Sequence, residues 1–174
     1  MHRSVLEFAH AVLSPAEVEG KLVLDVGARN VNGTLRDVVM PHKPRMYIGI
    51  DIEDGPGVDL VLDVLDAPDV LRPGGFDVVL CAGTLGYIDD WGGALKAMVT
   101  LLRRRGVLLL TVRGLYSEQR DLPASWRFTE ADLRQIFEQQ DIIEIVDDPM
   151  QPALLCKIIK RNGKLNLGPD VVRM

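Results

Sequence analysis

The sequence has few of the residues that build disulfide frameworks and metal centres. Its 174 residues include two cysteines and three histidines, and only 5% of them are aromatic. Cys81 and Cys156 lie far apart in apolar runs, which is typical of core thiols in a reducing compartment rather than of a disulfide pair. The histidines are scattered, so the spacing of a metal site is absent. We therefore expect no bound metal.

Long apolar runs and an excess of positive charge are absent as well. No apolar run approaches the ~20 residues that a membrane-spanning helix needs, and Glu7, His10 and Glu17 interrupt the pattern of a signal peptide. The formal net charge of −5 disfavours broad electrostatic binding to nucleic acid. We interpret the arginine triplet at 103–105 as the end of a helix, where the helix dipole favours cations. We expect a cytoplasmic protein with no membrane span, and nucleic acid is not the expected partner.

What the sequence does have is an alternation of apolar strands with helical segments. Its length and its 47% hydrophobic content suit a single domain over residues 1–174 with a sizeable core. Helical spacing and a capping pattern at Ser14 predict an N-terminal helical segment over 1–20. The tail over 161–174 has no clear periodicity and is expected to be irregular. Strands are predicted over 21–26, 45–50, 58–62, 76–82, 106–112, 142–146 and 153–159.

The connections between these strands set the fold class. Helices are predicted over 33–40, 91–104 and 129–140. The link between the last two strands is too short for a helical crossover, so those strands are expected to pair antiparallel. The alternation elsewhere predicts an α/β fold: a doubly wound, mostly parallel seven-stranded sheet with an antiparallel last strand and helices on both faces. In such sheets, ligands bind at the carboxyl ends of the strands.

The segment 22–33, LVLDVGARNVNG, is the first sign of such a site. An apolar run is followed by Asp25 and by Gly27, whose conformational freedom lets the backbone approach a ligand closely. Five residues separate Gly27 from Gly33, so the segment lacks the G-x-G-x-x-G spacing of dinucleotide sites. Asp51 and Asp63 follow the next two predicted strands. Three acidic strand ends beside a glycine loop predict a binding site at that edge of the sheet.

Five segments together resemble one protein family. They are LDVGARNVNG, YIGIDIEDGPGVDLVLD, FDVVLCAGTLGYIDDW, LLRRRGVLLLTV and WRFTEADLRQIF, and they span about residues 21–160. Their order and spacing resemble the Rossmann-like, class I methyltransferases that depend on S-adenosylmethionine, in particular those that act on small molecules. The resemblance implies S-adenosyl-L-methionine as the cofactor, S-adenosyl-L-homocysteine as its product, and methyl transfer to a small-molecule acceptor that the sequence does not identify.

The resemblance also implies roles for the glycine loop. Asp25 matches the position that contacts the methionine part of the cofactor, and Gly27 lets the backbone approach the same part. Ala28 and Arg29 continue this loop, although many members have glycine or another small residue there. Gly33 would permit close packing where the next helix starts. We therefore predict that all five residues border the cofactor.

Further along the chain, the resemblance implies contacts to the nucleoside and to the sulfonium. Asp51 matches the acid that accepts hydrogen bonds from both ribose hydroxyls, since a carboxylate has two acceptor oxygens. Ile52 would lie on the adenine ring. Asp63, with Val64 beside it, matches the position near the adenine amino group, and Asp66 is a rival for that role. The loop under the methionine end and the sulfonium would begin with Cys81, Ala82 and Gly83.

No residue is assigned as catalytic, because the cofactor supplies the reactive group and orientation alone accelerates such a transfer. Many small-molecule members have a Glu-His pair where this chain has Leu85-Gly86-Tyr87. A histidine base is therefore not favoured, and His10 is the one that could reach the site. Two alternatives stay open: a non-catalytic cofactor-binding or partner module, and an NAD-binding oxidoreductase, which the glycine spacing disfavours. Other candidates for the acceptor end are Tyr87, Asp89, Asp90, Arg113, Tyr116 and Trp126.

Overall fold

The computed structural model describes residues 2–115 and 126–173, and a seven-stranded sheet forms its centre. The strand order is β3-β2-β1-β4-β5-β8-β7. Neighbours from β3 to β5 pair in parallel, and β8 is antiparallel to both β5 and β7. The predicted fold class is confirmed. The antiparallel strand, β8, lies between β5 and the edge strand β7. The strands are β1 (Leu22–Val26), β2 (Met46–Asp51), β3 (Leu60–Val61), β4 (Phe76–Ala82), β5 (Leu102–Arg113), β7 (Asp141–Asp147) and β8 (Ala153–Ile159).

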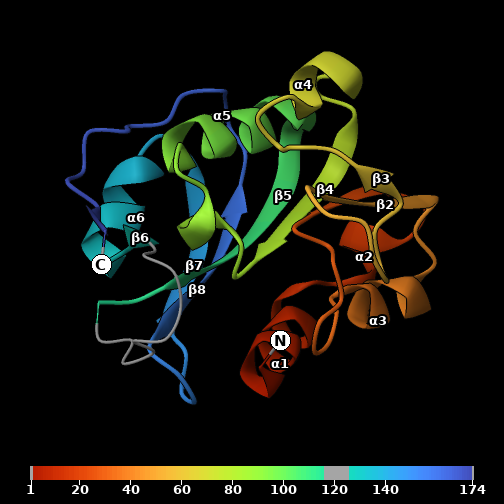
Figure 1. The fold of residues 1–174 in the computed structure, drawn as a ribbon, viewed down its shortest axis with the longest axis horizontal. Coiled ribbons are helices and arrows are strands. Elements are labelled where there is room, and N and C mark those ends of the chain that lie inside the picture. The colour runs from red at the N-terminus through yellow and green to blue at the C-terminus, as the bar shows by residue number, and fades with distance from the viewer. Residues whose placement is uncertain (1, 116–125, 174) are drawn as a thin grey trace.

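Helices cover both faces of the sheet (Figure 1). On one face, α1 (Arg3–Val12), α2 (Pro15–Val18) and α3 (Arg36–Val39) share a buried cluster with Val23, Val78 and Leu80. On the other, α4 (Ala67–Val70), α5 (Trp91–Leu101) and α6 (Glu130–Ile136) pack over Leu24 and Val79. Successive strand residues point to opposite faces, so a centre that is buried on both sides requires the continuous apolar runs seen in the sequence. No helix in the described part of the chain is both long and apolar enough to cross a bilayer.

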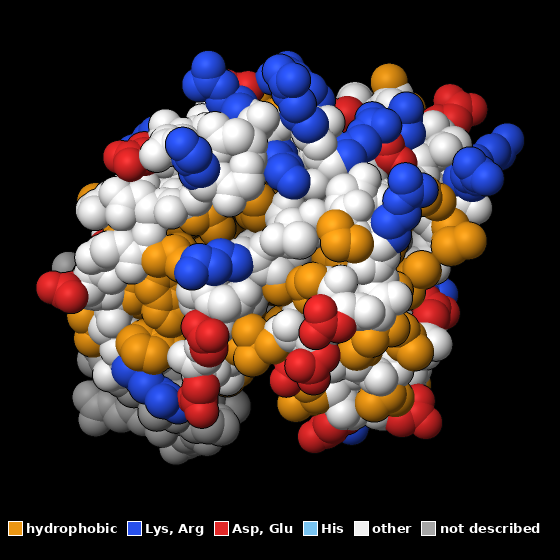
Figure 2. All heavy atoms as spheres, turned by 90° about the horizontal axis from the view of Figure 1, so that it is seen from above, with side chains coloured by type: hydrophobic (Ala, Val, Ile, Leu, Met, Phe, Trp, Pro, Cys, Tyr) orange, Lys and Arg blue, Asp and Glu red, His pale blue; other side chains and the backbone are white. Residues whose placement is uncertain are grey.

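The arginine triplet does not end a helix, so that interpretation was wrong. Helix α5 ends at Leu101, and β5 begins at Leu102 with an irregular register in which Phe76 pairs with Leu102 and Val78 with Val107. The arginines follow in this irregular stretch, where Arg103 pairs with Asp77 and Arg105 with Asp141. Figure 2 shows lysine and arginine side chains gathered on the face seen from above, where Figure 1 places α4 and the start of β5. These cations lie away from the carboxyl ends of the strands.

Other segments depart from the prediction in length. The helix predicted over 33–40 shrinks to α3 and a 3₁₀ turn, η1 (Met40–His42), and the helix predicted to reach 140 ends at Ile136. A second 3₁₀ turn, η2 (Leu85–Tyr87), follows β4. The tail expected to be irregular contains β9 (Val172–Arg173), which pairs antiparallel with β6 (Trp126–Arg127). Regular pairing therefore continues close to the C-terminal end.

Buried polar contacts attach the N-terminal helices to the last strands. The Lys157 side chain, in a residue only 6% exposed, donates to Glu17 Oε2 over 2.9 Å and to the carbonyl oxygen that ends α1. Ser4 Oγ donates to Asp148 Oδ2 over 2.8 Å, in the turn between β7 and β8. A buried charge is tolerated when it is paired and hydrogen-bonded. These contacts hold α1 beside the carboxyl edge of the sheet, where β8 starts.

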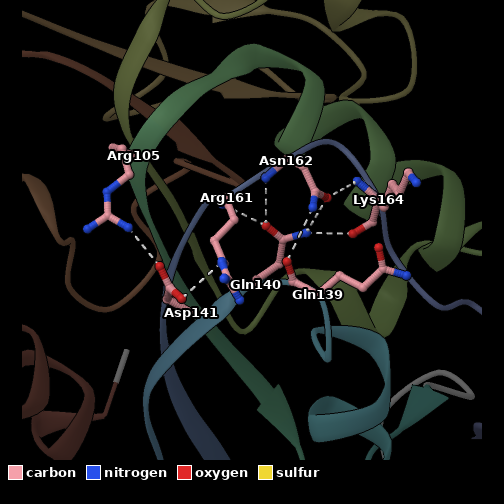
Figure 3. Close-up of polar contacts among 7 residues, drawn as sticks. All are labelled: Arg105, Gln139, Gln140, Asp141, Arg161, Asn162 and Lys164. Atoms are coloured by element: carbon pink, nitrogen blue, oxygen red, sulfur yellow. Dashed lines mark hydrogen bonds and ion pairs between the residues drawn. The ribbon is translucent and has the colours of Figure 1, made fainter.

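Gln140 attaches the tail to the body of the protein (Figure 3). It is 5% exposed, and its amide nitrogen donates to the carbonyl oxygen of Lys164 over 2.5 Å. Its amide oxygen accepts from the backbone nitrogen of Arg161 over 2.9 Å. Beside it, Asp141 pairs with both Arg105 and Arg161. The start of the tail is thus attached through a buried amide whose hydrogen-bonding capacity is largely used.

We predict that Gln140→Ala lowers the free energy of unfolding by about 1–3 kcal/mol, because it removes the buried amide and its hydrogen bonds to the backbone of the tail. Urea denaturation followed by circular dichroism measures the change. Gln139→Ala is the matched control: Figure 3 shows its side chain pointing away from the cluster, and only its carbonyl contacts Asn162. Equal effects of the two substitutions would contradict this account of the anchor.

Candidate functional site

A cavity of about 1140 Å³ opens at the carboxyl edge of β1, β2, β4 and β5. Its walls come from the loops after these strands, from the start of α1, and from the turn between β7 and β8. This is the edge at which ligands bind in doubly wound sheets. Most of the residues predicted for the cofactor line this cavity: Asp25, Gly27, Ala28, Arg29, Gly33, Asp51, Ile52, Ala82 and Gly83.

The remaining predicted residues are not among those that line the cavity. Cys81 is fully buried in the core, and burial together with the charge of Asp25 raises the pKa of its thiol to about 12. Val64 is 4% exposed in the same cluster. Asp63 accepts a hydrogen bond from the backbone of Leu65 over 2.9 Å, as in a strand-end turn. Asp66, its rival, is exposed at the start of α4.

Gly27 is required by its surroundings as well as by its conformation. Its φ of +76° lies in the left-handed region, and a Cβ built on it would lie 1.9 Å from Thr84 Oγ1. The backbone nitrogens of Gly27 and Ala28 both donate to the carbonyl oxygen of Ile50, over 2.9 and 3.0 Å. Glycine thus lets the loop after β4 lie directly on the loop after β1, while β2 holds that loop from the other side.

Asp51 lies where β2 meets this loop. Its Oδ2 accepts from the backbone nitrogen of Arg29, and its Oδ1 from that of Glu53, each over 3.1 Å. A carboxylate has about four acceptor sites, so each oxygen keeps capacity for a further donor. Arg29 stands where many members of the resembled family have glycine or another small residue. Its side chain forms an ion pair with Glu53. Its charge is directed along the turn after β2.

Glycines that the sequence analysis did not use hold this turn in place. A Cβ on Gly57 would lie 2.6 Å from the carbonyl oxygen of Ala28, and a Cβ on Gly49 would lie 2.3 Å from that of Gly57. The backbone nitrogen of Asn30 donates to the carbonyl oxygen of Pro56 over 2.7 Å. Two loops therefore pack backbone against backbone. A glycine inside an apolar strand, as in YIGID, is the signal that could have indicated such an approach.

Asp25 is the most perturbed carboxylate at the cavity. It is 5% exposed, and burial raises its pKa to about 7 despite a 2.6 Å hydrogen bond donated by Tyr47 and the nearby charge of Arg36. Burial and Asp25 also raise the pKa of Tyr47, so its phenol stays protonated and donates. Because the folded pKa of Asp25 is raised, its contribution to stability is full below its ordinary pKa and is lost as pH rises through about 7.

The support behind Asp25 comes from residues that sequence reasoning missed. The Arg36 guanidinium lies 4.6 Å from the centre of the Tyr47 ring and forms an ion pair with Asp59. Asp59 Oδ2 also accepts from the backbone nitrogen of Gly49 over 2.7 Å. Tyr47 and Arg36 thus form a layer that holds the Asp25 carboxyl at the cavity wall. No spacing in the sequence links these residues, because they come from α3, from β2 and from the loop before β3.

The other end of the cavity has a different character. Arg113 and Tyr87 line it, the guanidinium donates to the Tyr87 hydroxyl, and it lies 5.0 Å from the centre of the ring. His2 and Val5 of the N-terminal segment also line the cavity. His10, the histidine considered in the sequence analysis, is exposed and is not among the lining residues. Sequence reasoning missed His2 because nothing local in the sequence shows that α1 folds back over this edge.

The other residues proposed for the acceptor end make structural contacts. Asp90 caps α5 by accepting from the backbone nitrogen of Gly93 over 2.7 Å, as its position before the helix indicated. Asp89 forms an ion pair with Arg173 over 2.5 Å, and its carbonyl oxygen accepts from Trp126 Nε1 over 3.1 Å. Tyr116 lies outside the described residues. The structure therefore brings Tyr87 and Arg113 to the cavity but not Asp89, Asp90 or Trp126.

Residues 2–148 match a protein family described as "Methyltransferase domain". Curated protein sequences gave no match. Among solved structures, a Burkholderia thailandensis 1,6-didemethyltoxoflavin N1-methyltransferase with S-adenosylhomocysteine bound is similar, with TM-score 0.70, 19% identity, and 91% of this chain and 79% of that one covered. The N-methyltransferase NodS of Bradyrhizobium japonicum is also similar, with TM-score 0.67, 17% identity, and coverage of 92% and 98%.

A third similar structure is a Haloferax volcanii chain in complex with the Trm112 methyltransferase activator. It has TM-score 0.70 and 17% identity, with 92% of this chain and 90% of that one covered. At such identities the likeness to solved structures shows the fold alone. The family match spans most of the sequence and shows the family. The chain belongs to the methyltransferase domain family and has the fold of the enzymes that use S-adenosylmethionine.

Proposed function

We propose that this protein transfers a methyl group from S-adenosylmethionine to a small-molecule acceptor. The observation that carries the proposal is the Asp51 carboxylate, which is held by two backbone nitrogens at the cavity wall and keeps acceptor capacity on both oxygens. A diol is the group that two adjacent acceptor oxygens fit. The family match and the position of the cavity at the carboxyl edge support the same function.

The residues present fit the proposed cofactor. Asp51 would hold the ribose hydroxyls, and Asp25 would pair with the ammonium of the methionine part. The Gly27–Ala28 backbone would lie along the same part, with Ile52 against adenine. A volume of about 1140 Å³ is at the upper end for one small ligand, which leaves room for an acceptor. Asp63, Val64 and Cys81 remain predictions for contacts that the cavity lining itself does not support.

The bound cofactor would supply an activated methyl group on a sulfonium. The protein's part is to orient the acceptor and exclude water, and orientation alone can contribute ~7–11 kcal/mol to such a reaction. The α1 helix and the β7–β8 turn, joined by Ser4 and Asp148, would exclude water from the acceptor end. Tyr87 and Arg113 would contact the acceptor there. These roles require no assigned base, in keeping with direct methyl transfer.

We predict that Asp51→Ala weakens S-adenosylmethionine binding by about 1–3 kcal/mol, because two polar contacts to the ribose are lost. Isothermal titration calorimetry measures the dissociation constant. Asp54→Ala is the control, since Asp54 is exposed in the same turn and its side chain accepts from the backbone of the next residue. If a well-folded Asp51→Ala protein binds the cofactor normally, the assigned ribose contact is wrong.

A second prediction concerns pH. With a pKa of about 7, Asp25 is mostly neutral at pH 6 and mostly ionised at pH 8, and only the ionised form attracts an ammonium group. The affinity for S-adenosylmethionine should therefore rise about tenfold from pH 6 to pH 8.

Two comparisons isolate the role of Asp25. Asp25→Asn should bind more weakly at pH 8 and lose this pH dependence. 5′-Methylthioadenosine, which lacks the amino-acid part, should bind the unaltered protein with the same affinity at both pH values. A pH dependence shared by both ligands would place its origin elsewhere than Asp25.

Turnover separates an enzyme from a binding module of the same fold. Formation of S-adenosylhomocysteine, measured with the chain alone and a panel of hydroxylated and amino-substituted small molecules, is expected for at least one acceptor. Cofactor binding without turnover by any acceptor would favour a non-catalytic module. The assay would then be repeated with a partner protein added, because the similar Haloferax volcanii chain is bound to a methyltransferase activator.

A further inference from the structure

Arg127 is a buried arginine, and two of its side-chain nitrogens have no partner in the fold that the structure describes. The residue is 5% exposed, and its Nε and Nη1 atoms are buried with no hydrogen-bond partner among residues 2–115 and 126–173. Taking a guanidinium out of water is costly unless it is paired and hydrogen-bonded. A protein that retains such a group either accepts a loss of stability or provides the group for a ligand that completes its contacts.

Neighbouring elements fix the position of Arg127. It lies in β6 opposite Val172 of β9, and the backbone nitrogen of the next residue, Phe128, donates to the carbonyl oxygen of Arg113 over 2.9 Å. Arg173 lies over the ring of the preceding residue, Trp126, with 5.6 Å to its centre. The backbone on both sides of Arg127 is therefore held in place. A side chain on such a support is preorganised for binding.

The groups around Arg127 give this region positive charge. Burial is the largest cause that lowers the pKa of Arg127, the charge of Arg113 lowers it further, and Tyr87 opposes the shift. Among the described residues, acids on the adjoining elements have other partners: Asp89 pairs with Arg173, Glu130 pairs with Arg134, and Asp90 caps α5. The carboxylates that line the cavity, Asp25, Asp51 and Glu53, lie at the proposed cofactor end.

We propose that the methyl acceptor is an anionic small molecule, whose carboxylate or phosphate group binds the guanidinium groups of Arg127 and Arg113 beside Tyr87. Arginine is suited to this role because its planar donors match the oxygens of both anions. Arg113 and Tyr87 line the cavity, so an anion held there leaves the remainder of the acceptor facing the proposed cofactor end. The proposal rests on the proposed function and narrows the class of its substrate.

Titration with simple aromatic probes tests the anion site directly. Benzoate and phenyl phosphate carry the two anions, and benzamide is a neutral counterpart of benzoate. In ¹⁵N spectra of the arginine Nε groups, we expect either or both anions to shift the Arg127 signal, and benzamide not to shift it. The relative affinities of the two anions show which group the site takes. Equal binding of benzoate and benzamide, or no shift at Arg127 with any probe, would overturn the proposal.

Two variants give a readout that a structural role would not produce. Arg127→Gln should weaken anion binding at least about tenfold, and it should leave the melting temperature unchanged or raised because buried donors without partners are removed. Arg134→Gln, which alters an exposed arginine on α6, should retain anion binding. A marked loss of stability in Arg127→Gln, together with unchanged anion binding, would assign Arg127 to the fold instead.

Cofactor binding and turnover distinguish failure of this proposal from failure of the proposed function. Arg127→Gln should bind S-adenosylhomocysteine as the unaltered protein does, because Arg127 is remote from Asp51 in the arrangement proposed. In the acceptor panel, hydroxylated or amino-substituted compounds that also carry a carboxylate should be methylated. Their counterparts with a neutral carboxamide in its place should not. If only neutral acceptors are methylated, the anion site is wrong and the methyltransferase activity stands. If no cofactor binds, the proposed function itself is wrong.

Discussion

The backbone contact between the loops after β1 and β2 is the constraint on which the site depends. The nitrogens of Gly27 and Ala28 share the Ile50 carbonyl oxygen, and Asn30 donates to Pro56. Because Gly57 has no Cβ, the two loops approach closely enough for these bonds to form. The same approach brings the backbone nitrogen of Arg29 to the Asp51 carboxylate. Asp51 is therefore oriented by main chain, which is more rigid than a contact between two long side chains.

Two ionisable groups are buried near this cavity without full compensation, and they have opposite signs. Asp25 has its proton affinity raised by burial, and Arg127 has its own lowered. Each lies among groups that hold its position, Tyr47 in one case and the β6–β9 pair in the other. Functional sites are where such costs persist, because a ligand of opposite charge recovers them. The polarity of the cavity thus favours a cation at the β1 end and an anion at the β5 end.

The sequence predicted the sheet and the loop after β1 because both depend on local patterns. Apolar runs mark strands that are buried on both faces, and Gly27 marks a left-handed turn after the first of them. The end of α5 was misplaced because the arginines at 103–105 suit a helix end as well as a strand start. Their pairing with Asp77 and Asp141, which settles the matter, is tertiary. Tyr47, Arg36 and Asp59 were missed for the same reason.

The acceptor end was the hardest part to predict, and its construction explains why. Its described walls come from segments that are distant in sequence: α1, the turn after β7, and the end of β5. They are brought together by single long-range contacts, such as Ser4 to Asp148 and Lys157 to Glu17. β9 then folds back to fix β6 beside β5. Such a region can change its chemistry without disturbing the sheet. The acceptor specificity that we propose therefore depends on side chains such as Arg127, whose burial and missing partners no local pattern in the sequence indicates.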